Sequence, residues 1–232
     1  MRLNKYIAHC GIGTRRTAAD LVKAGEIYVN GKVETNPGYQ VKEQDTVTYK
    51  DKALHVVKNK TYLLLNKPKN TSLSKEDSRK TVYEFLKDYA SENLISASNL
   101  SYESSGLLIM TNDEGFVEKL SDPSQKLIAI YHIILDKPLT DEHLKSLEKG
   151  FEFEGKQIQI KEINYVKGAA RTELGIKTFT YQDHEIRTIL EHLGYAIIKL
   201  DRTYFAGLTK KDLPRGFSRK LSEEEISRLK YL

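Results

Sequence analysis

The stretch Ser96-Ala-Ser-Asn-Leu-Ser-Tyr-Glu-Ser-Ser-Gly-Leu-Leu-Ile-Met-Thr-Asn-Asp113 decides the fold of this 232-residue chain. Its first half is small and polar, and its second half holds the continuous apolar run Leu107 to Met110. Such a run predicts a strand that is buried on both faces. Gly106, just before it, permits close approach of another backbone segment. A polar loop that leads into a buried strand is a common position for functional side chains, although serines also cap ordinary turns.

The same stretch resembles the active-site strand of RsuA/RluB-type pseudouridine synthases, whose motif reads G-R-L-D-x-D/E-T-S-G-L-L-(I/L)-(L/M)-T-N-D. Two central positions differ from this motif. Ser101 stands at the position of the family's catalytic aspartate, and Asn99 stands at the arginine two residues before it. The resemblance therefore implies the family fold without its nucleophile. The positions that agree are Leu100, Glu103, Ser105, Gly106, Leu107, Leu108, Thr111, Asn112 and Asp113.

The resemblance covers nearly the whole chain. Residues 61–68 are similar to the family's Y-L-L-L-N-K-P strand, and residues 128–135 keep Tyr131 of the K-x-Y-x-V motif with Ala129 at the lysine position. In the family this tyrosine packs against the target uracil and is a candidate proton acceptor, whereas an aromatic in such a strand is otherwise plain core. In residues 181–195 the resemblance implies that Arg187 is the basic residue that pairs with the catalytic aspartate. We expect that usual partner to be missing.

The first 58 residues show a second pattern. Two short amphipathic helices, the second capped by Thr14, precede a strand that runs into Asn30-Gly31, the strongest short hairpin signal. Arg15 and Arg16 lie in the first turn of the second helix, where the helix dipole disfavours cations unless an anion binds there. The order of these elements is similar to the ribosomal-protein-S-four-like RNA-binding domain. That resemblance implies RNA contacts from Arg15, Arg16 and Lys32, with Lys5 and Lys23 as lesser candidates.

The distribution of charge supports an anionic partner. The net charge is +5, and residues 1–60 hold eleven Lys/Arg against six Asp/Glu, so the whole surplus lies in the first quarter of the chain. A basic leading region favours nucleic acid, although a solvated charged face gives the same count. Phosphate contacts of this kind provide affinity with little sequence choice.

The remaining composition excludes several classes of protein. No apolar run is long enough for a membrane span, and the N-terminus lacks the apolar core of a signal peptide, so we expect a cytoplasmic protein that does not bind membranes. The single Cys10 is interpreted as a structural thiol, and the six histidines lack metal-ligand spacing. We expect no metal and no cofactor, and we expect a monomer.

Together these patterns predict an α+β chain. A helix-helix-hairpin RNA-binding domain over residues 1–58 precedes a pseudouridine-synthase-like domain over residues 61–232, with a mixed, mostly antiparallel sheet and helices. We also expect one strand over residues 41–49, a linker over residues 50–52 and 58–60, and a polar loop over residues 69–80 without aromatic residues. One helix should start at Thr81, and another, over residues 143–149, should be capped by the segment that begins at Thr140.

The resulting hypothesis is an RNA-binding relative of the pseudouridine synthases that has lost catalysis and acts on ribosomal RNA or in ribosome assembly. A carboxylate is ionised at neutral pH, whereas the Ser101 hydroxyl is not and needs an adjacent base. Two alternatives remain open. The first is an active isomerase that uses a displaced carboxylate such as Glu103 or Asp183, and the second is a binding module that kept the fold without binding RNA.

Overall fold

The computed structural model describes residues 1–232 except 11, 13–14, 56–59, 154–155, 159 and 180–182. The chain divides into two compact units. Residues 1–62 with 88–95 and 111–115 form the first, and residues 63–87, 96–110 and 116–232 form the second. The domain boundaries at residues 58 and 61 stay a prediction.

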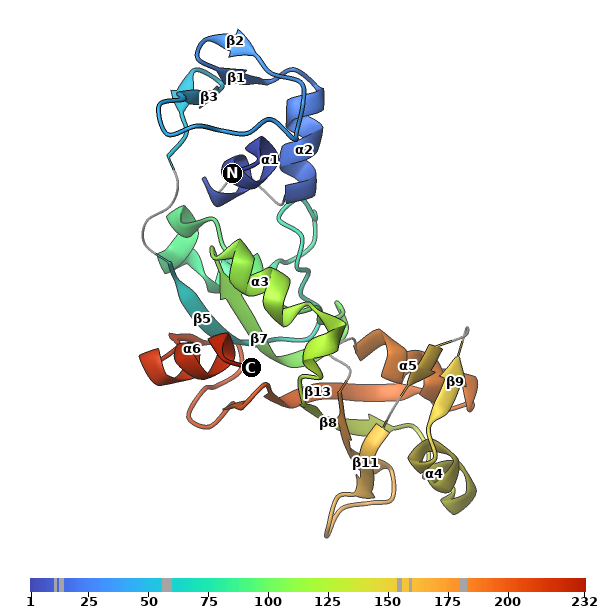
Figure 1. Ribbon diagram of the computed structural model, residues 1–232. Helices are drawn as coiled ribbons and strands as arrows, with labels where there is room; N and C mark the ends of the chain where they lie inside the picture. Colours follow the sequence, from blue (N-terminus) through green and yellow to red (C-terminus); the bar gives the residue numbers. More distant parts are fainter. Residues whose placement is uncertain (11, 13–14, 56–59, 154–155, 159, 180–182) are drawn as a thin grey trace. The chain divides into compact units, whose positions relative to one another are not determined.

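Two short helices and a small sheet build the N-terminal part (Figure 1). Within the described residues the sheet order is β2-β1-β3-β4, and the paired strands are antiparallel. The helix-helix-hairpin order is therefore confirmed, whereas the proposed cap Thr14 lies outside the described residues. The elements are α1 (Leu3–His9), α2 (Arg15–Lys23), β1 (Ile27–Val29), β2 (Lys32–Val33), β3 (Val47–Tyr49) and β4 (Lys52–Ala53).

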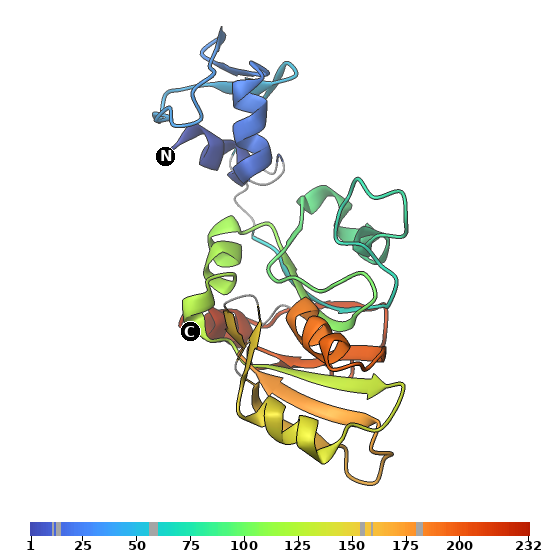
Figure 2. The same cartoon turned by 90° about the vertical axis from the view of Figure 1, so that its right-hand side faces the viewer.

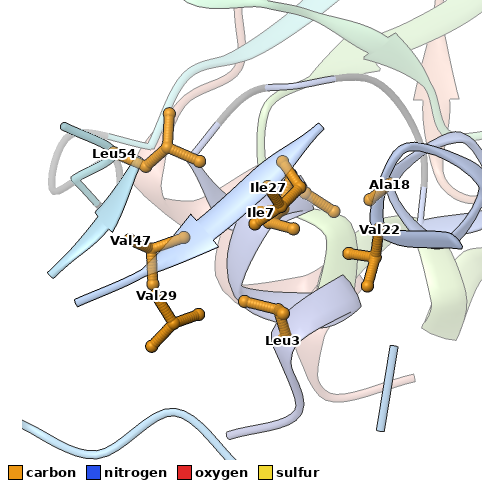
Figure 3. Packing of buried hydrophobic residues seen from close by; sticks show 9 residues of the cluster. Leu3, Ile7, Ala18, Val22, Ile27, Val29, Val47 and Leu54 are labelled. Atoms are coloured by element: carbon orange, nitrogen blue, oxygen red, sulfur yellow. The ribbon is translucent and has the colours of Figure 1, made fainter. Parts of the chain in front are cut away.

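A compact apolar core joins these helices to one face of the sheet. Figure 3 shows Leu3 and Ile7 of α1 facing Val22 of α2 and Ile27 of β1. All four side chains have no exposed surface. Burial of side chains of this size stabilises the fold by about 1.5–3 kcal/mol each, which explains how so short a pair of helices can form.

The predicted Asn30-Gly31 turn closes the hairpin between β1 and β2. Both residues have positive φ, 51° and 77°, as a type I′ turn requires. The Asn30 side chain accepts a hydrogen bond from the Thr46 backbone N–H at 2.9 Å and donates one to Asp45 at 2.8 Å. These bonds fix the turn against the segment that precedes β3.

Two predictions for this part of the chain are wrong. Residues 41–49 do not form one strand, because the carboxylate of Asp45 accepts hydrogen bonds from the Lys42 backbone N–H and the Tyr39 hydroxyl and so folds the segment before Val47 into a turn. Residues 50–52 are not a linker, and residues 58–59 of the predicted linker lie outside the described residues. Lys50 and Asp51 adopt positive φ and form a tight turn, after which β4 pairs with β3.

The large sheet carries the family motifs. Within the described residues its order is β11-β12-β8-β13-β7-β5-β15, with β14 on β13 and β6 on β7. β13 pairs parallel with β7, while β11, β12, β8 and β13 pair antiparallel in turn, so the expected mixed, mostly antiparallel sheet is confirmed. Its strands are β5 (Tyr62–Lys67), β6 (Ile95–Ser96), β7 (Ser105–Thr111), β8 (Ala129–Leu135), β11 (Ile160–Tyr165), β12 (Glu173–Thr178), β13 (Ile197–Phe205), β14 (Leu208–Thr209) and β15 (Ser218–Lys220).

Four helices accompany these strands. In Figure 2 the strands β8, β12 and β13 run between α5, drawn in orange, and α4, drawn in yellow. The predicted cap of α4 is confirmed, because the Thr140 hydroxyl accepts a hydrogen bond from the His143 backbone N–H at 3.2 Å. None of the described helices combines the length and apolarity that crossing a bilayer requires. The helices are α3 (Glu114–Leu120), α4 (Asp141–Glu148), α5 (Asp183–His192) and α6 (Glu223–Lys230), and β9 (Phe151–Phe153) pairs with β10 (Lys156–Ile158).

The helix predicted from Thr81 is replaced by two short 3₁₀ segments, Val82–Phe85 and Lys87–Glu92. A third 3₁₀ segment spans Pro123–Gln125. The predicted start at Thr81 holds, because Thr81 caps the first segment. The backbone N–H groups of Glu84 and Leu86 bond to carbonyls three residues earlier, at 3.3 and 3.1 Å, so the segment forms a short 3₁₀ helix instead of an α-helix.

Gly106 is the point at which the motif strand β7 meets β13. It has φ of 118°, and a Cβ atom built there would lie 2.3 Å from the carbonyl oxygen of Arg202 and 2.5 Å from its nitrogen. Real Cβ atoms do not approach backbone this closely. The close packing that the sequence suggested for this glycine is therefore required by the parallel pairing of β7 with β13.

Replacement of Gly106 by alanine is expected to destabilise the protein by more than about 3 kcal/mol, because backbone displacement adds to the strain of positive φ. Urea unfolding measures the change. Gly194→Ala is the matched control, since its φ is 82° but no atom lies within 4 Å of the added carbon. An equal cost for both variants would contradict the close packing.

Candidate functional site

A buried lysine organises the loop around the family's nucleophile position. The ammonium of Lys67, at the end of β5, has no exposed surface and donates hydrogen bonds to the carbonyls of Ser101 at 2.9 Å, Tyr102 at 3.2 Å and Ser104 at 2.8 Å. Burial lowers the pKa of Lys67 to about 8, although the nearby Asp183 carboxylate opposes this shift. The lysine therefore stays mostly charged at neutral pH and draws the loop carbonyls together.

A buried carboxylate holds the same loop from the other side. Asp183 is the first residue of α5 and has no exposed surface. It accepts hydrogen bonds from the Ser101 backbone N–H at 3.0 and 3.2 Å and a further one from the Ser104 hydroxyl. The carboxylate lies at the N-terminus of a helix, where negative charge is favoured. Asp183 and Lys67 thus clamp residues 101–104 between two opposite charges.

Arg187 has a carboxylate partner other than the one that the family motif supplies. Its Nη1 atom lies 3.4 Å from Oε2 of Glu103, whose side chain is 63% exposed, and 3.9 Å from Glu191 one turn along α5. Its Nη2 atom donates to the Ser104 hydroxyl at 3.4 Å. The structure therefore brings Ser101, Glu103, Asp183 and Arg187 together around one loop, as the sequence motifs implied.

The two substituted motif positions carry no charge in this group. Ser101 is half-buried, and the bonds that fix it run through its backbone. Asn99 is exposed, and its carbonyl oxygen accepts a hydrogen bond from Arg202 at 3.1 Å. Neither side chain supplies the ionised carboxylate or the guanidinium that the family has at these positions.

Tyr131 lies in β8 with no exposed surface. Burial raises the pKa of Tyr131 to about 12, although the Arg202 guanidinium beside its hydroxyl opposes this shift. A phenol with this pKa stays protonated at neutral pH and is a poor proton acceptor. In this structure Tyr131 is therefore a core residue opposite Arg202 of β13.

A second buried cation supports the motif strand. The guanidinium of Arg202 in β13 has no exposed surface and donates to the carbonyl of Leu107 at 2.8 Å and to the hydroxyl of Ser98 at 2.9 Å. One residue earlier, Asp201 forms ion pairs with Arg215, at 2.9 Å, and with Lys210. These hydrogen bonds lower the pKa of Asp201 to about 2 against the opposing effect of burial.

The proposed RNA-binding residues belong to the first unit. Arg16, Lys23 and Lys32 are exposed, and Lys5 and Arg15 are half-buried. Arg15 and Arg16 open α2, and Lys32 follows the Asn30-Gly31 turn. Their role in RNA binding stays a prediction.

No group of described residues has the composition of a metal site. Cys10 is half-buried, and burial raises the pKa of its thiol to about 12, so it stays protonated as a structural thiol does.

Comparison with known proteins identifies the two parts of the chain. Residues 1–47 match the family described as S4 domain, and residues 61–192 match the family described as RNA pseudouridylate synthase. The chain belongs to the RNA pseudouridylate synthase family. The family prediction from the sequence motifs is thereby confirmed.

Relatives in this family are similar over their full length. The ribosomal large subunit pseudouridine synthase B of Bacillus subtilis is 32% identical, with 100% of this chain and 96% of the relative covered. An uncharacterized RNA pseudouridine synthase of Aquifex aeolicus is 31% identical, with 100% and 97% covered. A crystal structure of a pseudouridylate synthase matches with a TM-score of 0.71 at 22% identity and covers 99% of each chain, which shows the shared fold.

Sequence reasoning missed the two buried cations at this site. The sequence motifs place Lys67 in the strand over residues 61–68 and give no role to its charge or to that of Arg202. A charged residue inside an otherwise apolar strand is rarely buried without partners, so this was the signal that could have identified them. Their partners, 34 to 104 residues away along the chain, could not be read from local sequence.

Burial of Lys67 predicts that the free energy of unfolding depends on pH. Because the pKa of Lys67 in the folded protein, about 8, lies below the 10.5 of an exposed lysine, the unfolded chain binds more protons between these two pH values. The free energy of unfolding of the wild type, measured relative to Lys67→Met, should therefore rise between pH 8 and 10.5 by up to about 3 kcal/mol. Urea unfolding of both proteins at pH 7, 9 and 10 measures it, and a difference that is flat or falls with pH would contradict the burial of a charged lysine.

Proposed function

We propose that this protein binds ribosomal RNA or a ribosomal precursor through its S4 domain, and that it has lost the isomerase chemistry of its family. The observation that carries the second half is the neutral hydroxyl of Ser101 at the nucleophile position, beside a carboxylate, Asp183, that is fully buried and already bonded. The basic surplus in residues 1–60 and the ribosomal relative support the first half.

The chemistry explains why this substitution matters. Pseudouridine formation in this family depends on an aspartate near the C1′ or C6 atom of the target uridine, and loss of one essential group costs several orders of magnitude in rate. Within the described part of the chain the Ser101 hydroxyl has no hydrogen-bonded base that could activate it. Asp183 bonds to the backbone N–H of Ser101, and its lack of exposed surface keeps it from a substrate in this conformation.

A specific observation favours a second candidate, an active isomerase with a displaced carboxylate. Glu103 is exposed and pairs with Arg187, the residue that in the family accompanies the nucleophile. Glu103 and Ser101 lie in a turn that the bond from the Ser104 backbone N–H to the Ser101 carbonyl closes at 3.1 Å, and Glu103 occupies its own position in the motif instead of position 101. A binding module without RNA affinity is the third possibility, and the match of residues 1–47 to the S4 domain family, together with the presence of Arg15 and Arg16, argues against it.

The RNA-binding half is tested with the Arg15→Ala/Arg16→Ala double variant. Loss of two phosphate contacts should weaken binding to ribosomal RNA and lower the slope of log K against log salt by about one to two units. Lys145→Ala/Lys149→Ala is the matched control, because it removes the same charge from exposed positions of the second unit and should leave the slope nearly unchanged. Equal effects of the two double variants, or RNA binding that salt does not change, would count against the S4 domain as the RNA-binding part.

The catalytic half is tested by incubation of the purified protein with unmodified ribosomal RNA and quantification of pseudouridine in the digested RNA. We expect no conversion above background for the wild type and for Glu103→Gln. Conversion by the wild type that Glu103→Gln abolishes would establish the displaced carboxylate instead. Conversion that survives Glu103→Gln but not Asp183→Asn would assign the reaction to Asp183.

A further inference from the structure

The polar loop over residues 69–80 contacts aromatic rings that its own sequence lacks. Lys75 lies over the ring of Tyr83 at 4.9 Å, Lys80 over Phe85 at 4.7 Å, and the guanidinium carbon of Arg79 over Tyr102 at 4.1 Å. The third contact is the shortest of these and is made with the residue that follows Ser101. All of these residues belong to the second unit.

The guanidinium of Arg79 is held along one edge. Its Nε atom donates to Oδ1 of Asp77 at 3.0 Å and its Nη2 atom to Oδ2 at 2.7 Å, and the backbone N–H of Arg79 bonds to the same carboxylate at 2.9 Å. These hydrogen bonds hold the pKa of the Asp77 carboxyl well below its usual range. The Arg79 side chain is nevertheless 57% exposed. Asp77 covers one edge of the guanidinium, and the Tyr102 ring covers one of its two faces. The exposed surface of the guanidinium therefore includes its other face.

The support beneath this guanidinium is fixed relative to residue 101. The carbonyl of Tyr102 accepts hydrogen bonds from Lys67 Nζ at 3.2 Å and from the Thr71 backbone N–H at 3.3 Å. The loop is closed by the bond from the Ser72 backbone N–H to the carbonyl of Lys80 at 2.8 Å. Arg79 and Tyr102 are therefore oriented before any ligand arrives, which reduces the entropy cost of binding.

We propose that the open face of Arg79, backed by Tyr102, stacks on a base of single-stranded RNA beside the nucleotide position at residue 101. The proposal rests on the RNA binding proposed above. Because Asp77 already neutralises the charge of Arg79, a phosphate would gain little here, whereas a planar guanidinium keeps its ability to stack on a base. The contact would recognise an unpaired base with little preference among the four, since every base has a π face.

The test compares two probes that carry the same backbone charge, a 12-nucleotide oligouridylate and its fully abasic counterpart, with the full-length protein. Arg79→Lys keeps the charge and removes the planar group. We expect this variant to bind oligouridylate about 5- to 100-fold more weakly than the wild type, the range that loss of one base stack gives, and to bind the abasic strand as the wild type does.

Two further variants separate stacking from damage to the loop. Tyr102→Phe keeps the ring and should bind as the wild type does, whereas Tyr102→Leu removes the support and should reproduce the effect of Arg79→Lys. Thermal melting of each variant reports whether it folds. Equal weakening of both probes by Arg79→Lys, or unchanged binding of oligouridylate, would overturn the stacking proposal and leave RNA binding by the protein intact. Failure of the wild type to bind either probe or ribosomal RNA would overturn both proposals.

Discussion

Two buried charges, Lys67 and Asp183, hold the same loop from opposite sides, and the site depends on this constraint. A lysine with no exposed surface loses its hydration, and only strong partners offset that cost. Here the partners are the loop carbonyls of Ser101, Tyr102 and Ser104, together with the electrostatic attraction of Asp183. Asp183 in turn binds the Ser101 N–H and the Ser104 hydroxyl. Both charges act on the backbone, so the shape of the loop does not depend on the side chain at position 101.

Other contacts that support the motif strand are equally independent of the side chains at positions 99 and 101. Arg202 reinforces the same strand by donating to the carbonyls of Leu107 and Asn99, and Gly106 allows β13 to come close enough for these bonds. Neither an aspartate nor an arginine is needed at positions 101 and 99 to form any of these contacts. A serine at position 101 is therefore compatible with the fold, the loop and the position of Arg187.

The sequence predicted those features that local patterns determine. The apolar run before Thr111 predicts β7, the Asn30-Gly31 pair predicts the hairpin, and Thr140 predicts the start of α4. The strand over residues 41–49 was wrong because Asp45 folds the preceding segment into a turn. The helix from Thr81 begins where predicted but forms short 3₁₀ segments, because its backbone bonds run to carbonyls three residues earlier.

The family motifs correctly place Arg187 near the loop that contains Glu103. They identify neither the ion-pair partner of Arg187 nor the role of Lys67. Both features depend on tertiary contacts. The ion pair of Arg187 with Glu103 joins residues on α5 and the motif loop, and the bonds of Lys67 join β5 to that loop. Spacing along the chain carries no information about such contacts, because a buried charge is matched in space and not in sequence.

Amide hydrogen exchange at Ser101 tests the clamp most directly. If Asp183 holds this N–H from a buried position, the amide should exchange slowly in the wild type, and Asp183→Ala should accelerate its exchange about 10- to 100-fold, as expected for loss of a hydrogen bond to a charged group. Amides in the core of β8 should keep their protection in both proteins. Exchange at Ser101 that is as fast in the wild type as in an unstructured peptide, or that is unaffected by the substitution, would contradict the account.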